Sequence, residues 1–418
     1  MALSIWATPL LYELLPNPTW LIFLFVFIAV IRSLKIFDPP NKPEVVYSRN
    51  STKSSNYSIG DVLEKCEILH EIYSPPLIWG RNGHIQTAAY GLLGHASLKR
   101  TYDKRHVIEL SDNSSVLFDV FEPINTHPSG GDYTLALCPG IANTSESNYI
   151  RTCVHYAQEK GYRCAVLNHL GALPHVRLTS KRIFSYGGTE ELEAMMNRLI
   201  DLYPNTRFIS IGFSMGGNIT TRYLASMDFQ AVKKIIIGLS VGQGYCATRS
   251  SALYHDWENC RRAYNYFITE NMKRLLSRNY EMAVLPHVLD GTIDEQRLWS
   301  ATSIVALDES YSRRILGYSS VEEFYASCSC LPFIPNFKFP MVFLNAFDDP
   351  LIPSCLWTPI KEIASKNEYI GFILTKHGGH LGFLEGNSIS PNSVTWLDRF
   401  IVQLADAAVL TYDTTAKH

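Results

Sequence analysis

Between Tyr133 and Val241 the sequence alternates short, almost wholly apolar runs with amphipathic stretches of helical character. Strands that are buried on both faces of a parallel sheet give such continuous apolar runs, because helices cover both sides of the sheet. The predicted strands are Tyr133–Cys138, Arg163–Asn168, Arg207–Gly212 and Lys233–Val241. The predicted helices between them are Asn148–Lys160, Thr189–Tyr203 and Gly217–Met227. This alternation predicts an α/β fold with a mostly parallel, doubly wound sheet.

The alternation stops after Val241 and resumes with a predicted strand at Phe339–Ala346. The intervening residues 242–337 show helical stretches and no pattern typical of a buried strand, so we interpret them as an inserted helical cap. The predicted core is then 105–241 and 338–410, preceded by a membrane anchor at 1–40 and by a linker and N-terminal extension at 41–104.

The composition narrows the function classes. The 37 basic and 39 acidic residues nearly cancel over 418 residues, which disfavours a nucleic-acid binder. The 46% of hydrophobic residues excludes a disordered chain and favours contact with lipid or with apolar substrates. The nine cysteines show no repeated spacing, so we predict no disulfide framework, and Cys328 with Cys330 is weak evidence for zinc.

An apolar run near the N-terminus extends from Trp20 to Ile31 and is followed by Arg32 and Lys35. We interpret it as an uncleaved signal anchor and expect a single-pass membrane protein of the plasma membrane or endoplasmic reticulum. The basic residues that follow the run would place the C-terminal part in the cytoplasm. Asn-x-Ser/Thr triplets argue for the opposite side and for a glycoprotein, so the orientation stays open. Such triplets include those that begin at Asn50, Asn56, Asn113 and Asn143.

Gly212, Ser214 and Gly216 form a Gly-x-Ser-x-Gly motif between a predicted strand and a predicted helix. A sharp strand-to-helix turn brings the backbone close to its neighbours, so the residues on both sides of the serine must lack bulky side chains. Ser214 would then project from the carboxyl edge of the sheet as a nucleophile. The alternative is a glycine-rich helix start that only packs against the sheet.

A serine nucleophile needs a base, and that base needs a carboxylate that orients it. Asp349 follows the strand Phe339–Ala346 and is our candidate acid, with Asp348 as the alternative. His380, in a glycine-rich turn after the last predicted strand, is the candidate base. His377 is either a supporting residue or exposed.

Two backbone N–H groups must stabilise the oxyanion that forms on the substrate. We expect them to come from Met215 and from Ile141, with Ala142 as the alternative to Ile141. No metal or organic cofactor is required. We expect His169, His175 and His255 to be structural, and the pattern His127-x₄-Asp132, known from some acyltransferases, to be a surface loop.

Four further segments complete the pattern, namely Pro75–Thr87, Cys138–Asn143, Asn168–Leu173 and His377–Phe383. With the residues above, they resemble the α/β-hydrolase domain-containing protein 2 family of membrane-anchored monoacylglycerol lipases. The resemblance covers most of the chain after about residue 60. It implies the α/β-hydrolase fold, Ser214, Asp349 and His380 as the catalytic triad, and monoacylglycerols or short-chain esters as substrates. It also implies a single-pass anchor with the catalytic part outside the cytoplasm.

The leading hypothesis is therefore a membrane-anchored serine hydrolase that cleaves lipid esters through an acyl-enzyme, with the cap as an apolar roof over Ser214. An acyltransferase that uses the same acyl-enzyme is the first alternative. A receptor for hydrophobic ligands, built on the same fold but without catalysis, is the second.

Overall fold

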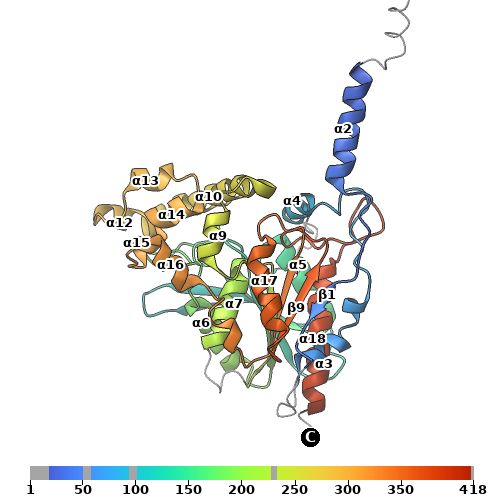
Figure 1. Cartoon of the computed structure of the whole chain (residues 1–418). Helices are drawn as coiled ribbons and strands as arrows, with labels where there is room; N and C mark the ends of the chain where they lie inside the picture. Colours follow the sequence, from blue (N-terminus) through green and yellow to red (C-terminus); the bar gives the residue numbers. More distant parts are fainter. Residues whose placement is uncertain (1–17, 50–57, 94–100, 227–232, 416–418) are drawn as a thin grey trace, which may run out of the picture.

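The computed structural model describes residues 18–49, 58–93, 101–226 and 233–415. Within these residues nine strands form one sheet in the order β1-β9-β8-β7-β6-β4-β5-β3-β2 (Figure 1). The strands are β1 (Glu44–Val46), β2 (Lys104–Glu109), β3 (Ser115–Phe121), β4 (Tyr133–Cys138), β5 (Arg163–Asn168), β6 (Arg207–Phe213), β7 (Ile235–Val241), β8 (Met341–Ala346) and β9 (Ile370–Thr375).

The centre of the sheet is parallel and its edges are antiparallel. Strands β5, β4, β6, β7, β8 and β9 pair in parallel, and β6 lies between β4 and β7. Strand β1 pairs antiparallel with β9, while β3 pairs antiparallel with both β5 and β2. The prediction of an α/β fold with a mostly parallel, doubly wound sheet is confirmed.

Helices cover both faces of the sheet, and strand β4 shows how its residues are divided between them. Ala136 and Cys138 point to the cluster that includes side chains of α6, α7 and α17. Leu135 and Leu137 point to the opposite cluster, against α5 and α18. Each fully buried aliphatic side chain contributes about 1.5–3 kcal/mol, so these two layers stabilise the core. The helices are α5 (Asn148–Glu159), α6 (Glu190–Leu202), α7 (Met215–Ser226), α17 (Ser354–Ala364) and α18 (Trp396–Thr415).

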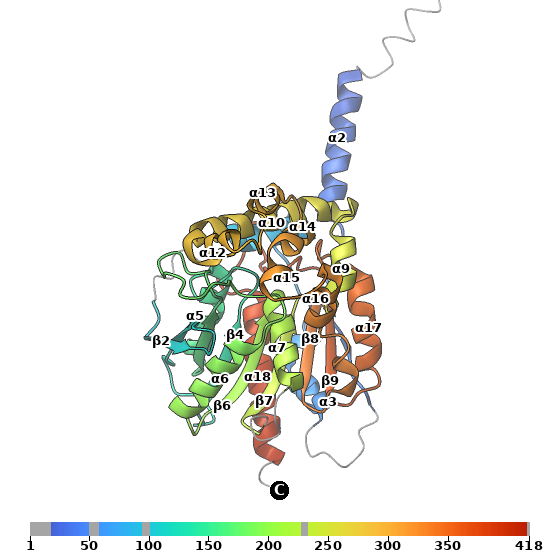
Figure 2. The same cartoon turned by 90° about the vertical axis from the view of Figure 1, so that its left-hand side faces the viewer.

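The segment between β7 and β8 consists of helices joined by loops, without a strand, and lies over one end of the strands of the sheet (Figure 2). Its own apolar cluster joins Ala247 to Val321, Phe324, Tyr325 and Cys328. We call this segment, residues 242–337, the cap. Its helices are α9 (Ala247–Leu253), α10 (Arg261–Arg278), α11 (Tyr280–Ala283), α12 (Leu285–Leu289), α13 (Glu295–Ser300), α14 (Ile304–Ser310), α15 (Ser312–Ile315) and α16 (Val321–Cys328), with the 3₁₀ turns η2 (Glu258–Cys260) and η3 (Ile334–Asn336).

The segment at 41–104, expected to be a linker and extension, contributes to the core. Besides β1 it contains α3 (Ile59–Lys65), the 3₁₀ turn η1 (Glu67–His70) and α4 (Gly83–Leu93). Ile59, Val62 and Leu63 of α3 are fully or almost fully buried in the cluster that also holds side chains of α18. This part of the chain is therefore packed against the sheet.

The apolar run near the N-terminus forms α2 (Pro18–Leu34), which stands away from the rest of the molecule (Figure 1). The helix has 17 residues and ends where Lys35 adopts a left-handed conformation with φ of 52°. At 1.5 Å per residue it is roughly 26 Å long, less than the bilayer's hydrocarbon core of about 30 Å.

In the part of the chain that the structure describes, no helix has both the length and the apolar character needed to cross a bilayer. The expectation of a single-pass anchor at the plasma membrane or endoplasmic reticulum is therefore wrong. The apolar run Trp20–Ile31 suggests the centre of a spanning helix, but the helix that forms around it has only 17 residues. The first 17 residues of the predicted anchor lie outside the described residues.

Candidate active site

Ser214 occupies the turn between β6 and α7, where its φ of 51° is in the left-handed region. Its backbone N–H donates to the carbonyl of Val241 at 2.8 Å, which ties the turn to the end of the neighbouring strand β7. A Cβ atom on Gly212 would lie 2.2 Å from the oxygen of Gly216, and one on Gly216 would lie 2.0 Å from that of Cys138. Both motif glycines are therefore required by close backbone contacts.

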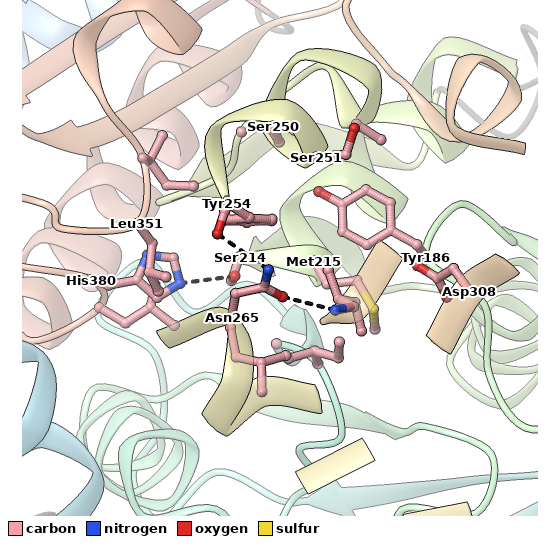
Figure 3. A pocket seen from close by; sticks show the side chains of 18 of the residues that line it. Tyr186, Ser214, Met215, Ser250, Ser251, Tyr254, Asn265, Asp308, Leu351 and His380 are labelled. Atoms are coloured by element: carbon pink, nitrogen blue, oxygen red, sulfur yellow. Dashed lines mark hydrogen bonds between the residues drawn. The ribbon is translucent and has the colours of Figure 1, made fainter. Parts of the chain in front are cut away.

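Three predicted site residues meet at the carboxyl edge of the sheet. The Nε2 of His380 lies 2.9 Å from the Oγ of Ser214 (Figure 3). Its Nδ1 lies 2.8 Å from the Oδ2 of Asp349. A carboxylate only accepts hydrogen bonds, so Nδ1 carries the proton and Nε2 is left to accept the serine proton. Asp349 is 3% exposed, and its Oδ1 accepts from the backbone N–H groups of Leu351 and Ile352.

Asp348, the alternative acid, and His377, expected to be a supporting or an exposed residue, lie next to Asp349 and His380. Oδ1 of Asp348 accepts from the backbone N–H of Gly379 at 2.8 Å, which fixes the turn that carries His380. His377 is buried, and its Nδ1 lies 3.7 Å from Oδ2 of Asp348. These two side chains support the turn, and Asp349 is the carboxylate that contacts the imidazole.

Helix α4 holds the His380 turn from outside, through residues that the sequence did not mark as functional. Oγ1 of Thr87 accepts from the backbone N–H of His380 at 2.8 Å, and Oε1 of Gln86 accepts from that of Leu384 at 2.8 Å. A Cβ on Gly379 would lie 2.4 Å from the Gly83 carbonyl, so helix and turn are in close contact. The only sequence signal was that Gln86 and Thr87 end the segment Pro75–Thr87.

The two expected oxyanion donors border the same cavity. Met215 is the first residue of α7 and Ile141 follows β4, and both line the cavity beside Ser214. Within the described residues, neither backbone N–H has a hydrogen-bond partner. The alternative donor, Ala142, adopts a left-handed φ of 58°.

The Asn143 triplet, read as a glycosylation signal, also lies here. The Asn143 side chain donates to the Ile141 carbonyl and accepts from the Ser147 hydroxyl. A side chain that is bonded at both ends beside the cavity is not placed to carry a glycan. Asn50 and Asn56 lie outside the described residues.

The cavity lies between the sheet edge and the cap and has a volume of about 170 Å³. Ile268 and Ile304 of the cap line it together with Leu351 and Ile352 of the core. Asn265 joins the cap helices above Ser214, because its amide donates to the Tyr254 carbonyl and accepts from the Ile304 N–H (Figure 3).

One carboxyl group, that of Asp308, lines this otherwise mostly apolar cavity. It is 9% exposed and accepts from the hydroxyls of Ser312 and Tyr325 at 2.5 and 2.8 Å. Burial raises the pKa of Asp308 to about 6, although the two hydroxyl donors oppose the shift. The cavity thus presents an apolar wall with one polar end.

The other histidines lie outside the Ser214 cavity or behind its wall. His169 is buried against the loop after β4, whereas His175 and His255 are exposed. His127 packs between Tyr133 and Tyr162, and Asp132 pairs with Arg163, so the pattern His127-x₄-Asp132 forms no joint site. No cluster of three or more metal-ligating side chains occurs among the residues that the structure describes.

Comparison with known proteins assigns the chain to a family. Residues 133–387 match the family described as the α/β hydrolase fold. Monoacylglycerol lipase ABHD2 of Mus musculus is 41% identical over 91% of this chain and 89% of its own length. The chain belongs to the α/β-hydrolase family.

Two further members of the family are similar over most of their length. Abhydrolase domain-containing protein 2 of Drosophila melanogaster is 39% identical over 95% of this chain and 98% of its own. Phospholipase ABHD3 of Homo sapiens is 28% identical over 83% of this chain and 81% of its own. The chain is a serine hydrolase of the α/β-hydrolase fold, and the resemblance to the domain-containing protein 2 branch is confirmed.

Proposed function

We propose that this α/β hydrolase is a monoacylglycerol lipase in which Ser214, His380 and Asp349 form the catalytic triad. The observation that carries the proposal is the pair of contacts made by one imidazole, 2.9 Å to the Ser214 hydroxyl and 2.8 Å to the Asp349 carboxylate. A general base must lie within about 2.6–3.2 Å, measured between heavy atoms, of the group whose proton it removes, and the contact with Ser214 meets that condition. The contact with Asp349 orients the imidazole.

The acylation step follows from these positions. His380 Nε2 takes the proton of the Ser214 hydroxyl while Oγ attacks the ester carbonyl, and the carbonyl oxygen becomes an oxyanion. The N–H groups of Met215 and Ile141 stabilise that charge. The protonated imidazole then gives its proton to the glycerol oxygen, which leaves as the tetrahedral intermediate collapses to an acyl-serine. Asp349 holds the imidazole in the required tautomer throughout.

Deacylation repeats the sequence with water. His380 Nε2 removes a proton from water, whose oxygen attacks the acyl carbonyl, and the resulting oxyanion is again stabilised by the two N–H groups. Oγ of Ser214 then leaves with the proton from the imidazole, and the fatty acid is released. Each proton that His380 removes from a nucleophile is then given to the leaving oxygen. The proposed mechanism therefore needs no cofactor.

The substrate class rests on the cavity and on the relatives. Ile268, Ile304, Leu351 and Ile352 give the cavity an apolar lining, which suits an acyl chain better than a charged group. ABHD2 of Mus musculus, which is 41% identical, carries the name monoacylglycerol lipase. These two facts favour a single-chain acylglycerol over a polar ester.

The experiment compares the purified wild type with Ser214→Ala on a monoacylglycerol and on a fluorophosphonate probe. We expect the wild type to release fatty acid and to be labelled, and the variant to lose labelling and about 10⁴-fold or more of its turnover. Labelling that persists in Ser214→Ala would exclude Ser214 as the nucleophile. Adding a second alcohol distinguishes hydrolysis, which yields only free acid, from acyl transfer, which yields a new ester.

A further inference from the structure

The loop that carries the proposed oxyanion donor Ile141 contains a glycine that gives it freedom to move. Gly140 lies between Pro139 and Ile141, and a Cβ at this position would make only ordinary contacts, at 3.5 Å or more. Without a side chain, the backbone on either side of Gly140 rotates easily. An N–H group is a useful oxyanion donor only if its direction is fixed before the charge forms, so other groups must restrain the loop.

One peptide unit of this loop is held at both of its polar atoms by buried or partly buried side chains. The Pro139 carbonyl lies 2.9 Å from Nε2 of His169, and the N–H of Gly140 donates to the Tyr149 hydroxyl at 2.9 Å. That carbonyl and that N–H belong to the same planar trans peptide and point in opposite directions. The two side chains therefore hold the peptide plane against rotation from opposite sides.

Both side chains are fixed by their surroundings. His169 is 2% exposed, and burial lowers its pKa to about 4, so the imidazole is neutral at neutral pH. A carbonyl only accepts, so the one proton of the ring is on Nε2. The Tyr149 ring lies edge-on to Tyr90 and Phe213, with centroids 5.6 and 5.3 Å away, and Phe213 directly precedes Ser214.

The next peptide unit is held on its carbonyl side only. The Gly140 carbonyl accepts from the backbone N–H of Asn143 at 3.1 Å, and the Ile141 carbonyl accepts from the Asn143 amide at 2.9 Å. The N–H of Ile141 lies opposite the Gly140 carbonyl in its peptide and has no partner within the described residues. The restraints therefore leave one donor free, and that donor lines the cavity beside Ser214.

The far end of the same loop is anchored by the neighbour of His169. Oδ1 of Asn168 accepts from the backbone N–H of Ser145 at 2.9 Å, and its amide donates to the buried carboxylate of Asp119 at 3.0 Å. The Ser145 hydroxyl donates to the same carboxylate, which also pairs with Arg105. The end of β5 thus holds the loop at both ends, which gives the segment Asn168–Leu173 a physical role.

We propose that His169 and Tyr149 are positioning residues that jointly fix the Pro139–Gly140 peptide and thereby aim the N–H of Ile141 at the oxyanion of the substrate. This inference rests on the proposed function, because it assigns a purpose to a donor used in that mechanism. The two residues touch neither the substrate nor the reacting atoms, and they act through the backbone.

The test combines Tyr149→Phe, His169→Leu and the double variant, assayed on a monoacylglycerol and on p-nitrophenyl butyrate. Complete loss of an oxyanion donor costs about 10²–10³ in turnover, so each single variant should lose about ten- to a hundredfold in kcat with little change in KM. Because both side chains hold the same peptide, their effects on kcat should not multiply. The kcat of the double variant should be at most about threefold lower than that of the less active single variant.

Three controls separate positioning from a merely structural role. His169→Gln retains a side-chain N–H donor and should recover part of the kcat lost in His169→Leu. Tyr162→Phe removes a hydroxyl that donates to Asp406 far from the cavity and should leave kcat unchanged. The Ki of a trifluoromethyl ketone, whose adduct with Ser214 places an oxyanion beside Ile141, should rise by the factor by which kcat/KM falls.

Losses that multiply in the double variant, or an unchanged kcat with only a lower melting temperature, would overturn the inference. A wild type that cleaves the p-nitrophenyl ester but not monoacylglycerol would overturn only the proposed substrate class. The kcat of the loop variants could still be measured with the p-nitrophenyl ester. A wild type that is inert toward both esters would overturn the proposed function and this inference together.

Discussion

The carboxyl edge of the sheet and the cap face each other across one cavity, but they hold their buried carboxyl groups differently. At the sheet edge, Asp349 accepts from two backbone N–H groups in its own turn as well as from His380. In the cap, Asp308 accepts from the side-chain hydroxyls of Ser312 and Tyr325 and, among the described residues, from no backbone N–H. Backbone donors are placed by the fold, whereas side-chain donors depend on rotamers.

This difference separates the two tasks of the enzyme. The groups assigned to the reaction lie on strand ends and in loops that are tied to neighbouring strands or to α4, so their geometry depends on the whole core. The cap residues that border the cavity, such as Ile268 and Ile304, lie on helices of the cap. We therefore expect changes at the sheet edge to affect every substrate and changes in the cap to affect the choice among substrates.

The largest expected effect concerns the two adjacent aspartates of the sheet edge. Asp349→Asn removes the carboxylate that orients His380, so kcat should fall by about 10³–10⁴-fold on every ester. Asp348→Asn keeps the oxygen that accepts from Gly379 and should cost less than about tenfold. Steady-state kinetics on a short and a long ester measure both. Equal losses in the two variants would contradict the choice of Asp349.

The cap should show a large effect on stability rather than on catalysis, through Asp308. Its pKa is raised to about 6 by burial, so the folded protein binds this proton more tightly than the unfolded chain does. Asp308 therefore makes its full contribution to the free energy of unfolding below about pH 4. That contribution is lost as the pH rises through about 6. A shift of roughly two pKa units corresponds to a loss of up to about 3 kcal/mol.

Asp308→Asn removes this titration and tests the point. The difference in unfolding free energy, variant minus wild type, should increase between pH 4 and pH 7 by up to about 3 kcal/mol, as measured by urea denaturation. Asp201→Asn, an exposed position on α6, should show no such increase. A difference that is the same at both pH values would mean that Asp308 does not titrate in this range.

The sequence anticipates the sheet edge better than the cap, for physical reasons. Strands β4 and β5 have the predicted bounds, because each is a buried apolar run that ends at a turn residue. The sequence could place Ser214, Asp349 and His380 together at this edge because the steric needs of the turn and the order of strand ends leave signals in the sequence. Cap helices such as α11 and α15 have four residues each, too short to show a helical period.

The supporting residues of the site were missed for another reason. Thr87 contacts the His380 turn across 293 positions, and His169 contacts the Pro139 carbonyl across 30. A single threonine or histidine carries no periodicity, and its partner is a backbone atom of no particular residue type. The prediction of a single-pass anchor was wrong because apolar residues predict burial or lipid contact but do not fix where a helix starts.

A third prediction tests whether the cap sorts substrates by acyl length. Ile304 lines the cavity, and only its backbone N–H bonds to Asn265, so Ile304→Trp fills space without removing that bond. We expect kcat/KM for long-chain monoacylglycerols to fall at least about tenfold and that for acetyl esters to change little. Ile304→Val, which enlarges the cavity, is the matched control. Equal losses on both substrates would contradict a sorting role.

The smallest expected effect compares two residues with nearly the same backbone conformation. Ser214 at the sheet edge has a φ of 51°, and Cys260 before α10 in the cap has a φ of 55°. For Ser214 the left-handed conformation is fixed by the tight turn between β6 and α7, whereas Cys260 is exposed and does not line the cavity. Cys260→Gly should relieve strain and stabilise the protein by up to about 1 kcal/mol, reduced by the greater freedom of glycine in the unfolded chain.

The neighbouring Asn259, with a φ of 49°, tolerates this conformation better, so Asn259→Gly should gain less. Melting curves measure both, with kcat unchanged in each. A lower melting temperature for Cys260→Gly would show that the cysteine side chain stabilises the start of α10 by more than its backbone strain costs.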